Sequence, residues 1–149
     1  MIEGVLIEPL KSFKDERGEV RHMLRRDAPF FKNFGEVYFS TINPGYVKGW
    51  KMHKEMTQHF AVPVGNLKLV LYDRRENSST KGEIQEIIFG INNYQLVRIP
   101  PQVLYSFSPV GADHVMIVNC ADMPHSPDES VQFDLNDQTI PYQWDNARR

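Results

Sequence analysis

Cysteine and long apolar runs are both scarce in this chain. Its 149 residues include a single cysteine, Cys120, and no stretch that approaches the roughly 20 apolar residues of a membrane-spanning helix. One cysteine excludes an intrachain disulfide and fits a reducing compartment. The N-terminal sequence MIEGVLIEPL is acidic, and its apolar run is too short for a signal peptide. We therefore expect a cytoplasmic protein without a membrane segment.

An excess of charge of one sign is lacking as well. Lysine and arginine number 17 against 19 aspartate and glutamate residues, which gives a net charge of −2. The chain therefore has no overall basic footprint for nucleic acid, and an acidic substrate would have to meet positive charge placed locally. With 41% hydrophobic and 24% charged residues, the composition is that of one ordinary folded domain spanning residues 1–149.

Several catalytic signatures are missing too. The sequence has no Gly-x-Ser-x-Gly elbow, no recognisable cysteine and histidine signature, and no glycine-rich loop that opens a helix. Nucleophilic catalysis and phosphate-loop chemistry therefore have no support. Proton transfer by positioned side chains remains, and histidine suits it best because its pKa lies near neutrality.

Short alternating runs between turn signals fill most of the chain. They are typical of an antiparallel β-sandwich or barrel, and no convincing amphipathic helix interrupts them. The expected strands lie at 2–10, 19–26, 37–42, 60–64, 67–72, 84–89, 94–99, 103–107 and 114–120. Gly65-Asn66 predicts a tight hairpin between two of them. The almost wholly apolar run at 114–120 predicts a strand buried on both faces.

Ionisable side chains gather just before the strand at 60–64. They are His53 and His59, with Lys48, Lys51, Lys54 and Glu55 beside them. Such groups are costly to bury, so this stretch is the candidate site, and His53 is the leading base. A surface histidine in a charged turn is the alternative for His53.

A metal site is a second interpretation of the same stretch. His53-x-Glu55-x-x-Gln58-x6-Gly65 resembles the first motif of metal-binding cupins. The second cupin motif would supply a histidine shortly after Ile99-Pro100, where this chain has Tyr105. His59 or His114 would have to complete the ligands. We therefore expect neither metal nor cofactor, with a metal-dependent cupin as an alternative.

Five motifs in order resemble the dTDP-4-dehydrorhamnose 3,5-epimerase family. They are Phe13-x-Asp15-Glu16-Arg17-Gly18, Lys48-Gly49-Trp50-Lys51-Met52-His53, Asp73-x-Arg75-x-x-Ser78-x-Thr80-x-Gly82, Gln95-Leu96-x-x-Ile99-Pro100 and Asp122-Met123-Pro124-His125-Ser126-Pro127-x-x-Ser130. The resemblance implies an all-β, cupin-type jelly roll. It also implies a cofactor-independent epimerase that acts on a nucleotide-linked 4-keto-6-deoxy sugar in polysaccharide precursor synthesis.

The resemblance also implies roles for individual residues. His53 takes the position of the base, and Arg17 and Lys48 would contact the diphosphate. A homodimer is implied, whose N-terminal strands pair across the interface and lend Arg17 to the neighbouring site. The further substrate-binding candidates are Lys51, Gln58, His59 and Arg75, of which Gln58 or His59 occupies the slot of a family lysine.

The chain departs from the family pattern at three catalytic positions. His125 stands where the family has its tyrosine acid, and Tyr105 replaces a family histidine and could supply a phenol from another strand. Asp145, directly after Trp144, is the candidate carboxylate partner of His53. These departures leave open a 3,4-ketoisomerase of the same fold or a catalytically silent sugar-nucleotide-binding cupin.

Overall fold

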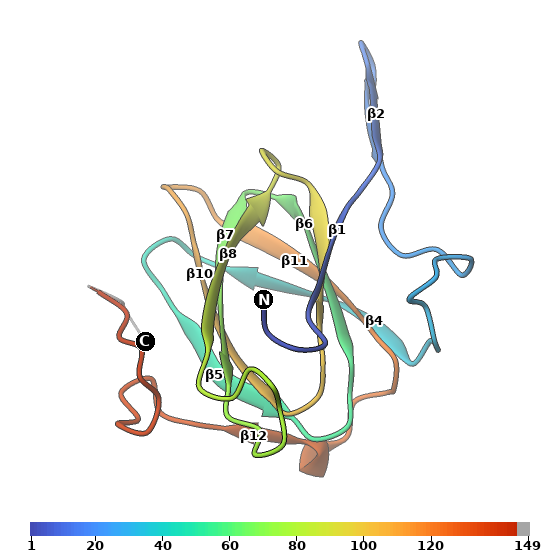
Figure 1. Cartoon of the computed structure of the whole chain (residues 1–149). Helices are drawn as coiled ribbons and strands as arrows, with labels where there is room; N and C mark the ends of the chain where they lie inside the picture. Colours follow the sequence, from blue (N-terminus) through green and yellow to red (C-terminus); the bar gives the residue numbers. More distant parts are fainter. Residues whose placement is uncertain (146–149) are drawn as a thin grey trace.

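The computed structural model describes residues 1–145 and has two five-stranded sheets that face each other (Figure 1). Every strand pair among these residues is antiparallel, and the only helical segment is one turn of 3₁₀ helix, η1. The expectation of an all-β, jelly-roll sandwich is thereby confirmed. The strands are β1 (Leu6–Pro9), β2 (Ser12–Asp15), β3 (Gly18–Arg21), β4 (Glu36–Ile42), β5 (Lys48–His53), β6 (Gln58–Val64), β7 (Asn66–Asp73), β8 (Ile84–Gly90), β9 (Gln95–Ile99), β10 (Val103–Pro109), β11 (Val115–Ala121) and β12 (Ser130–Gln132), with η1 at Pro127–Glu129.

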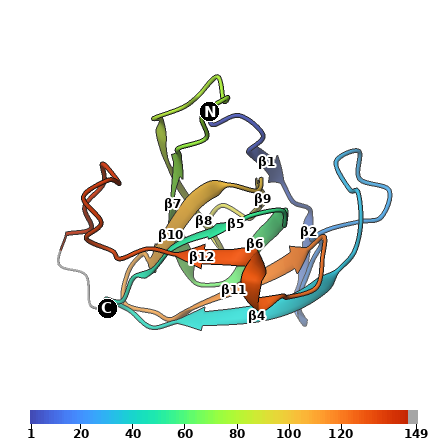
Figure 2. The same ribbon diagram turned by 90° about the horizontal axis from the view of Figure 1, so that it is seen from below.

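Sheet I has the order β1-β9-β6-β11-β4, and sheet II has the order β12-β5-β10-β7-β8. Seen from below, β12 and β5 of sheet II lie over β11 and β4 of sheet I (Figure 2). Side chains alternate along each strand, so one row from each sheet fills the interior. The main core includes Phe60, Val62, Leu69, Phe107 and Ile117, all nearly inaccessible to solvent.

The turn at Gly65 departs from the sequence expectation. The strands on either side of it do not pair, because β6 lies in sheet I and β7 lies in sheet II between β10 and β8. The predicted hairpin is therefore wrong, and the chain crosses from one sheet to the other. Gly65 suits the crossing because its φ is +76° and a Cβ there would lie 2.6 Å from the His114 carbonyl oxygen.

The outer face of sheet I carries apolar side chains that are partly exposed. Strand β11 buries only its inner face fully, since Met116 and Val118 on the other face are half-buried. On the neighbouring strand β4, Val37 and Phe39 are 45% and 64% exposed. The expectation of a strand buried on both faces is therefore not met within one chain.

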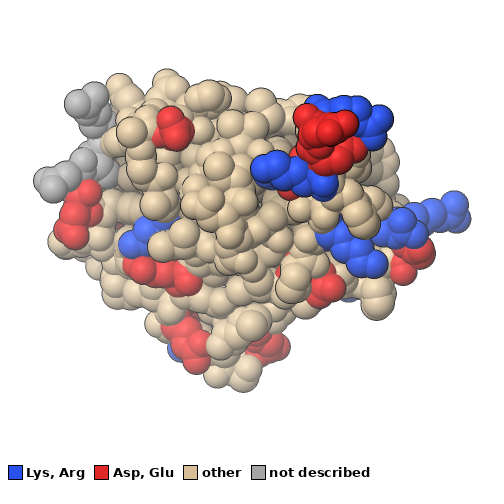
Figure 3. All heavy atoms as spheres, turned by 90° about the horizontal axis from the view of Figure 1, so that it is seen from above, with Lys and Arg blue, Asp and Glu red and all other residues tan. Residues whose placement is uncertain are grey.

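Strands β2 and β3 form a separate hairpin that projects from the sandwich (Figure 1). Its cross-strand pair Phe13 and Val20 is 60% and 63% exposed. Arg21 ties the base of the hairpin to the body, through a hydrogen bond to the Pro63 carbonyl oxygen and a contact with the Tyr94 ring. Viewed from above, the described residues show basic and acidic side chains beside one another rather than one broad patch of either sign (Figure 3).

The C-terminal segment after β12 lies against sheet II. Trp50, Val70 and Leu104 from the sheet pack with Ile140 and Tyr142 from this segment. This second cluster covers the outer face of the strands that carry the residues of the candidate site.

Candidate functional site

A cavity of about 510 Å³ opens between the two sheets. Its size is within the range of small-molecule sites. The wall from sheet I carries Tyr38, Ser40, Phe60, Ile117 and Asn119, and the wall from sheet II and the segment after it carries Lys48, Gly49, Lys51, Tyr105, Phe107, Gln132, Phe133, Asp134 and Leu135. Phe60, Phe107 and Ile117 give the lining an apolar part, and polar side chains reach the cavity from both walls.

Strands β5 and β10 bring two candidate residues together. Tyr105 on β10 pairs with Lys51 on β5, and the register shifts between Tyr105 and Ser106. Gly49 permits the close approach, because its φ is +126° and a Cβ there would lie 2.5 Å from the Ser106 Cβ. Such irregularities re-aim side chains beside functional sites. Here the His53 and Tyr105 rings lie parallel, with centroids 6.0 Å apart.

His53 lies between a carboxylate and a phenol. Its Nδ1 forms a very short hydrogen bond with Glu129 Oε2, and its Nε2 lies 3.2 Å from the Tyr105 hydroxyl. The other Glu129 oxygen accepts the backbone N–H groups of Glu55 and Met56, at 2.9 and 2.8 Å. Glu129 is therefore held as an acceptor, which places a proton on Nδ1 and leaves the Nε2 lone pair facing Tyr105.

Burial sets the protonation states of this chain of residues. It lowers the pKa of His53, although the Glu129 carboxylate partly opposes that shift. For Glu129, burial alone would raise the pKa, but the hydrogen bonds from His53 and the two amides outweigh it and the pKa is lowered. Burial strongly raises the pKa of Tyr105. At neutral pH the chain therefore consists of a carboxylate, a neutral imidazole and a phenol.

Two amide side chains continue the network to the opposite wall. Gln58 Oε1 accepts Asn119 Nδ2 at 3.0 Å and lies 3.3 Å from the Tyr105 hydroxyl, whose one proton can be donated either to Gln58 Oε1 or to His53 Nε2. Asn119 Nδ2 also donates to the Tyr38 hydroxyl oxygen at 2.7 Å. The orientation of the Asn119 amide follows from its other end, where Oδ1 accepts the His59 backbone N–H at 3.3 Å. Gln58 thus belongs to the network behind the cavity wall, and its contact with a substrate stays a prediction.

The two expected lysines lie on the cavity wall. Lys48 donates to the Thr41 carbonyl oxygen at 2.6 Å, while Lys51 has no hydrogen bond or ion pair with any residue in 1–145. Both side chains therefore bring positive charge to a cavity that would admit an acidic ligand.

The structure does not bring His59 to the cavity. Alternation along β6 turns it to the outer face of sheet I, where Nδ1 donates to the Cys120 carbonyl oxygen at 2.9 Å and the ring stacks on Phe30. It lines a separate hollow of about 180 Å³ with Arg98 and Asp122. The expectation of a substrate contact is not supported by this position.

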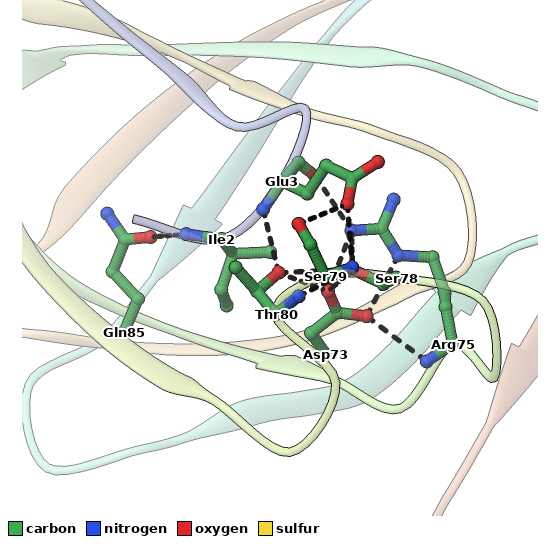
Figure 4. A network of polar contacts seen from close by, with 8 residues as sticks. All are labelled: Ile2, Glu3, Asp73, Arg75, Ser78, Ser79, Thr80 and Gln85. Atoms are coloured by element: carbon green, nitrogen blue, oxygen red, sulfur yellow. Dashed lines mark hydrogen bonds and ion pairs between the residues drawn. The ribbon is translucent and has the colours of Figure 1, made fainter.

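Arg75 also lies elsewhere, in a closed polar network at the start of the β7–β8 connection (Figure 4). Its Nε and Nη2 each lie 2.8 Å from the buried Asp73 carboxylate, and Nη2 donates to the Glu3 carbonyl oxygen at 2.7 Å. Ser78 and Thr80 donate to the same carboxylate at 2.6 and 2.7 Å. Arg75 therefore fastens the N-terminus to this loop, which corrects its assignment to the substrate.

Arg17 lies at the tip of the projecting hairpin and is 84% exposed. Its guanidinium binds Asp15 at 2.6 Å and touches no cavity residue of the same chain. Arg17 therefore lies away from the cavity of its own chain.

Two catalytic candidates near the C-terminus occupy other places than expected. His125 is exposed, does not line the cavity and donates its backbone N–H to Glu36. Asp145 is exposed after Trp144, whose Nε1 donates to Ser106 Oγ at 2.9 Å. The carboxylate that orients His53 is Glu129, so the expectation of Asp145 in that role is corrected.

Sequence reasoning does not single out Glu129 or Asn119. Glu129 follows the Ser126-Pro127 turn, 76 positions from His53, and only the fold brings the two together. Asn119 carries a signal in the sequence, because it is a polar residue inside the apolar run at 115–121. In the structure this residue is only 2% exposed. Buried amides are costly unless they are hydrogen-bonded, so such a residue marks a polar network.

Residues 1–145 contain no group of three or more histidine, cysteine, aspartate or glutamate side chains placed to hold a metal ion. The alternative of a metal-dependent cupin therefore has no set of ligands in this part of the chain to support it. A membrane-crossing helix is likewise not found within these residues.

The comparisons with known proteins agree with this architecture. The crystal structure of a dTDP sugar isomerase from Desulfovibrio desulfuricans G20 is 45% identical, with a TM-score of 0.95 over 99% of this chain and 94% of that one. A dTDP-4-dehydrorhamnose 3,5-epimerase from Elizabethkingia anophelis NUHP1 is 18% identical and shares the fold, with a TM-score of 0.80 over 97% and 82% of the chains.

Sequence relatives point the same way. The spore coat polysaccharide biosynthesis protein SpsL of Bacillus subtilis strain 168 is 30% identical over the whole length of both chains. The probable low-salt glycan biosynthesis epimerase Agl13 of Haloferax volcanii is 32% identical over 79% of this chain and 77% of its own. The model of the dTDP-4-dehydrorhamnose 3,5-epimerase family matches residues 1–149, and the chain therefore belongs to this family of sugar-nucleotide epimerases.

Proposed function

We propose that the chain epimerises a nucleotide-linked 4-keto-6-deoxy sugar by proton transfer next to the ketone, without a cofactor, in cytoplasmic polysaccharide precursor synthesis. The observation that carries the proposal is the buried Glu129–His53–Tyr105 chain, which ends at the wall of the 510 Å³ cavity. A carboxylate that orients a histidine, which in turn can take a proton from a hydroxyl, is the arrangement by which proteins activate a hydroxyl group.

The residues suggest how the proton moves. A ketone at C4 acidifies the C–H bonds of C3 and C5. Tyr105 borders the cavity and His53 lies behind it, so the Tyr105 oxygen takes the carbon-bound proton while its own proton passes to His53 Nε2. The electron pair of the broken C–H bond moves into a C=C bond and leaves an oxyanion at C4. The imidazolium that forms is balanced by the Glu129 carboxylate.

Positive charge at the cavity wall fits the rest of such a substrate. Lys51, without a protein partner among residues 1–145, is available to the C4 oxyanion or to a phosphate oxygen, and Lys48 lies on the same strand. Preorganised donors at a developing oxyanion are among the largest contributions to catalysis. The apolar floor made by Phe60, Phe107 and Ile117 accommodates a 6-deoxy methyl group.

A homodimer is part of this proposal. The β2–β3 hairpin exposes Phe13 and Val20, and a lone two-stranded hairpin is marginal without a surface to pack on. The outer face of sheet I exposes Val37 and Phe39 beside the half-buried face of β11. A second copy that covers this face would bury β11 on both sides, as its apolar sequence suggests. Arg17 would then reach the partner's cavity.

The test is proton NMR of dTDP-4-keto-6-deoxyhexoses in deuterated water. The expected result is deuterium incorporation at C3, C5 or both, with inversion of the exchanged centre. A product whose keto group has moved to C3 would instead indicate a 3,4-ketoisomerase. Binding of the sugar nucleotide without any exchange would indicate a silent binding protein and reject the proposal.

A further inference from the structure

Epimerisation requires two proton carriers on opposite sides of one carbon. If the same group removed and returned the proton on one face, the centre would keep its configuration. The Glu129–His53–Tyr105 chain belongs to the wall formed by β5, β10 and η1. The second carrier therefore has to come from the facing wall, which belongs to sheet I.

We propose that Tyr38 on β4 is the acid that delivers the second proton, with Asn119 as its positioning residue. This inference rests on the proposed epimerase function. Tyr38 lines the cavity from sheet I, while Tyr105 lines it from sheet II. The two phenols thus face one substrate space from two sheets.

The hydrogen bonds of Tyr38 leave its proton available. Its oxygen accepts Asn119 Nδ2 at 2.7 Å, and no residue within 1–145 accepts its hydroxyl proton. The Asn119 amide cannot be turned round, because its Oδ1 meets the His59 backbone N–H, which needs an acceptor. The acceptor side of Tyr38 is therefore occupied and its O–H is free to meet a ligand in the cavity.

The Asn119 donor also suits the product of proton delivery. When Tyr38 gives its proton to the enolate carbon, the C–H bond forms, the C4 carbonyl is restored and a phenolate remains. Asn119 Nδ2 points at that phenolate oxygen and stabilises it until solvent at the half-exposed ring returns a proton. Burial raises the pKa of Tyr38, which keeps it protonated before the reaction.

His125 is the competing acid, because it stands at the family's tyrosine position. It lies outside the cavity wall, and its backbone is tied to Glu36 at the outer end of β4. The two candidates therefore make different predictions, and a pair of variants separates them.

The experiment measures deuterium exchange and inversion separately, in deuterated water, for the wild type, Tyr38→Phe and His125→Ala. We expect Tyr38→Phe to exchange the carbon-bound proton within a few-fold of the wild-type rate and to lower inversion by at least about 100-fold, the contribution of a general acid. His125→Ala should invert like the wild type. Continued exchange by Tyr38→Phe shows by itself that the fold and the base are intact.

The other outcomes are equally decisive. Wild-type inversion rates in Tyr38→Phe, or a selective loss of inversion in His125→Ala, would overturn the assignment of Tyr38 while leaving the epimerase intact. Loss of both exchange and inversion in Tyr38→Phe, with an unchanged circular dichroism spectrum, would also reject it, because Tyr38 would then belong to proton removal. An absence of exchange in the wild type would reject the epimerase function and Tyr38 together.

Discussion

Two polar networks in this chain each surround a buried carboxylate, Asp73 or Glu129, but differ in whether they leave a polar group available to a ligand. Around Asp73, the arginine, serine and threonine donors all converge on one buried carboxylate and close the network on itself (Figure 4). Around His53, the network runs from Glu129 to Tyr105 and on to Asn119, and it borders a cavity at both phenols.

The family resemblance covers both networks, so motif matching alone does not distinguish them. Arg75 and Ser78 belong to the same motif as Asp73, and they stabilise a loop. His53 belongs to another motif, and its Nε2 lone pair lies next to a cavity-lining hydroxyl. A functional site is thus marked by polar capacity that the protein itself does not satisfy. The following changes test this contrast.

Replacing His53 by glutamine should have the largest effect on activity. The variant keeps a polar side chain but loses the basic nitrogen, so deuterium exchange from the substrate should fall by about 1,000-fold. The rate of deuterium exchange in Tyr105→Phe should fall by at least about 100-fold if the phenol relays the proton. NMR of the substrate in deuterated water measures both rates. Exchange by Tyr105→Phe at the wild-type rate would show that His53 meets the substrate without the relay.

Replacing Arg75 by alanine should lower the stability of the fold and leave the exchange rate almost unchanged. Asp73 would keep a buried carboxylate without its cationic partner, which should lower the free energy of unfolding by about 3 kcal/mol. For a chain of this length that corresponds to a fall in Tm of about 10 °C. Urea titration and thermal melting measure the loss.

The exchange rate of Arg75→Ala at 25 °C should remain within about threefold of the wild type, since Arg75 lines no part of the 510 Å³ cavity. A stable variant that has lost its activity would place Arg75 in the site and contradict the contrast between the two networks.

Replacing Glu129 by glutamine should lower exchange by about 10 to 100-fold and move its pH profile. Burial lowers the pKa of His53 and Glu129 partly restores it, so its removal should lower that pKa further. Activity needs neutral His53 and is lost as pH falls through this pKa, below 6.5. The acid limb should therefore shift to lower pH in Glu129→Gln.

Asp145→Asn is the matched control for the Glu129 variant, because Asp145 is the carboxylate that the sequence favoured. It should leave both the rate and the acid limb unchanged. An acid limb that moves in Asp145→Asn but not in Glu129→Gln would reverse the assignment of the carboxylate partner.

Replacing Arg17 by alanine should have the smallest effect, a rise in KM of about tenfold or less with little change in kcat, because the lost contact is to the diphosphate. If the chain is a homodimer, Phe39→Glu should cause a similar rise in KM because it dissociates the dimer. Sedimentation velocity detects that dissociation. A monomeric wild type with a normal KM would contradict the exchange of Arg17 between copies.

Much of the fold follows from local sequence, because alternation depends on neighbouring residues. The strands at 37–42, 84–89 and 103–107 are found within two residues of their expected ends. Gly65-Asn66 misleads because a tight turn looks the same whether the chain stays in one sheet or crosses to the other. Sheet membership depends on pairing with β10 and β8, which the turn itself does not encode.

The site is predictable to a lesser degree. His53, Gln58 and Tyr105 stand in or next to recognisable motifs, and the structure connects them by hydrogen bonds, while their roles stay predictions. Glu129 is missed and Asp145 is favoured because a partner far away in sequence is identified only by the path of the chain. Asn119 is obscured by the apolar strand that contains it.

The passage of the chain from one sheet to the other at Gly65 has a kinetic consequence. Because successive strands are divided between two sheets, the bonds of His53 close loops of 52 residues to Tyr105 and 76 residues to Glu129. Contacts of such long range form slowly, since their loop closure must precede any stabilising contact. The proton-transfer chain therefore assembles only when β5, β10 and the η1–β12 segment have come together in sheet II, and no isolated hairpin can carry it. The rate at which exchange activity recovers after dilution from urea thus reports how fast these long-range contacts form.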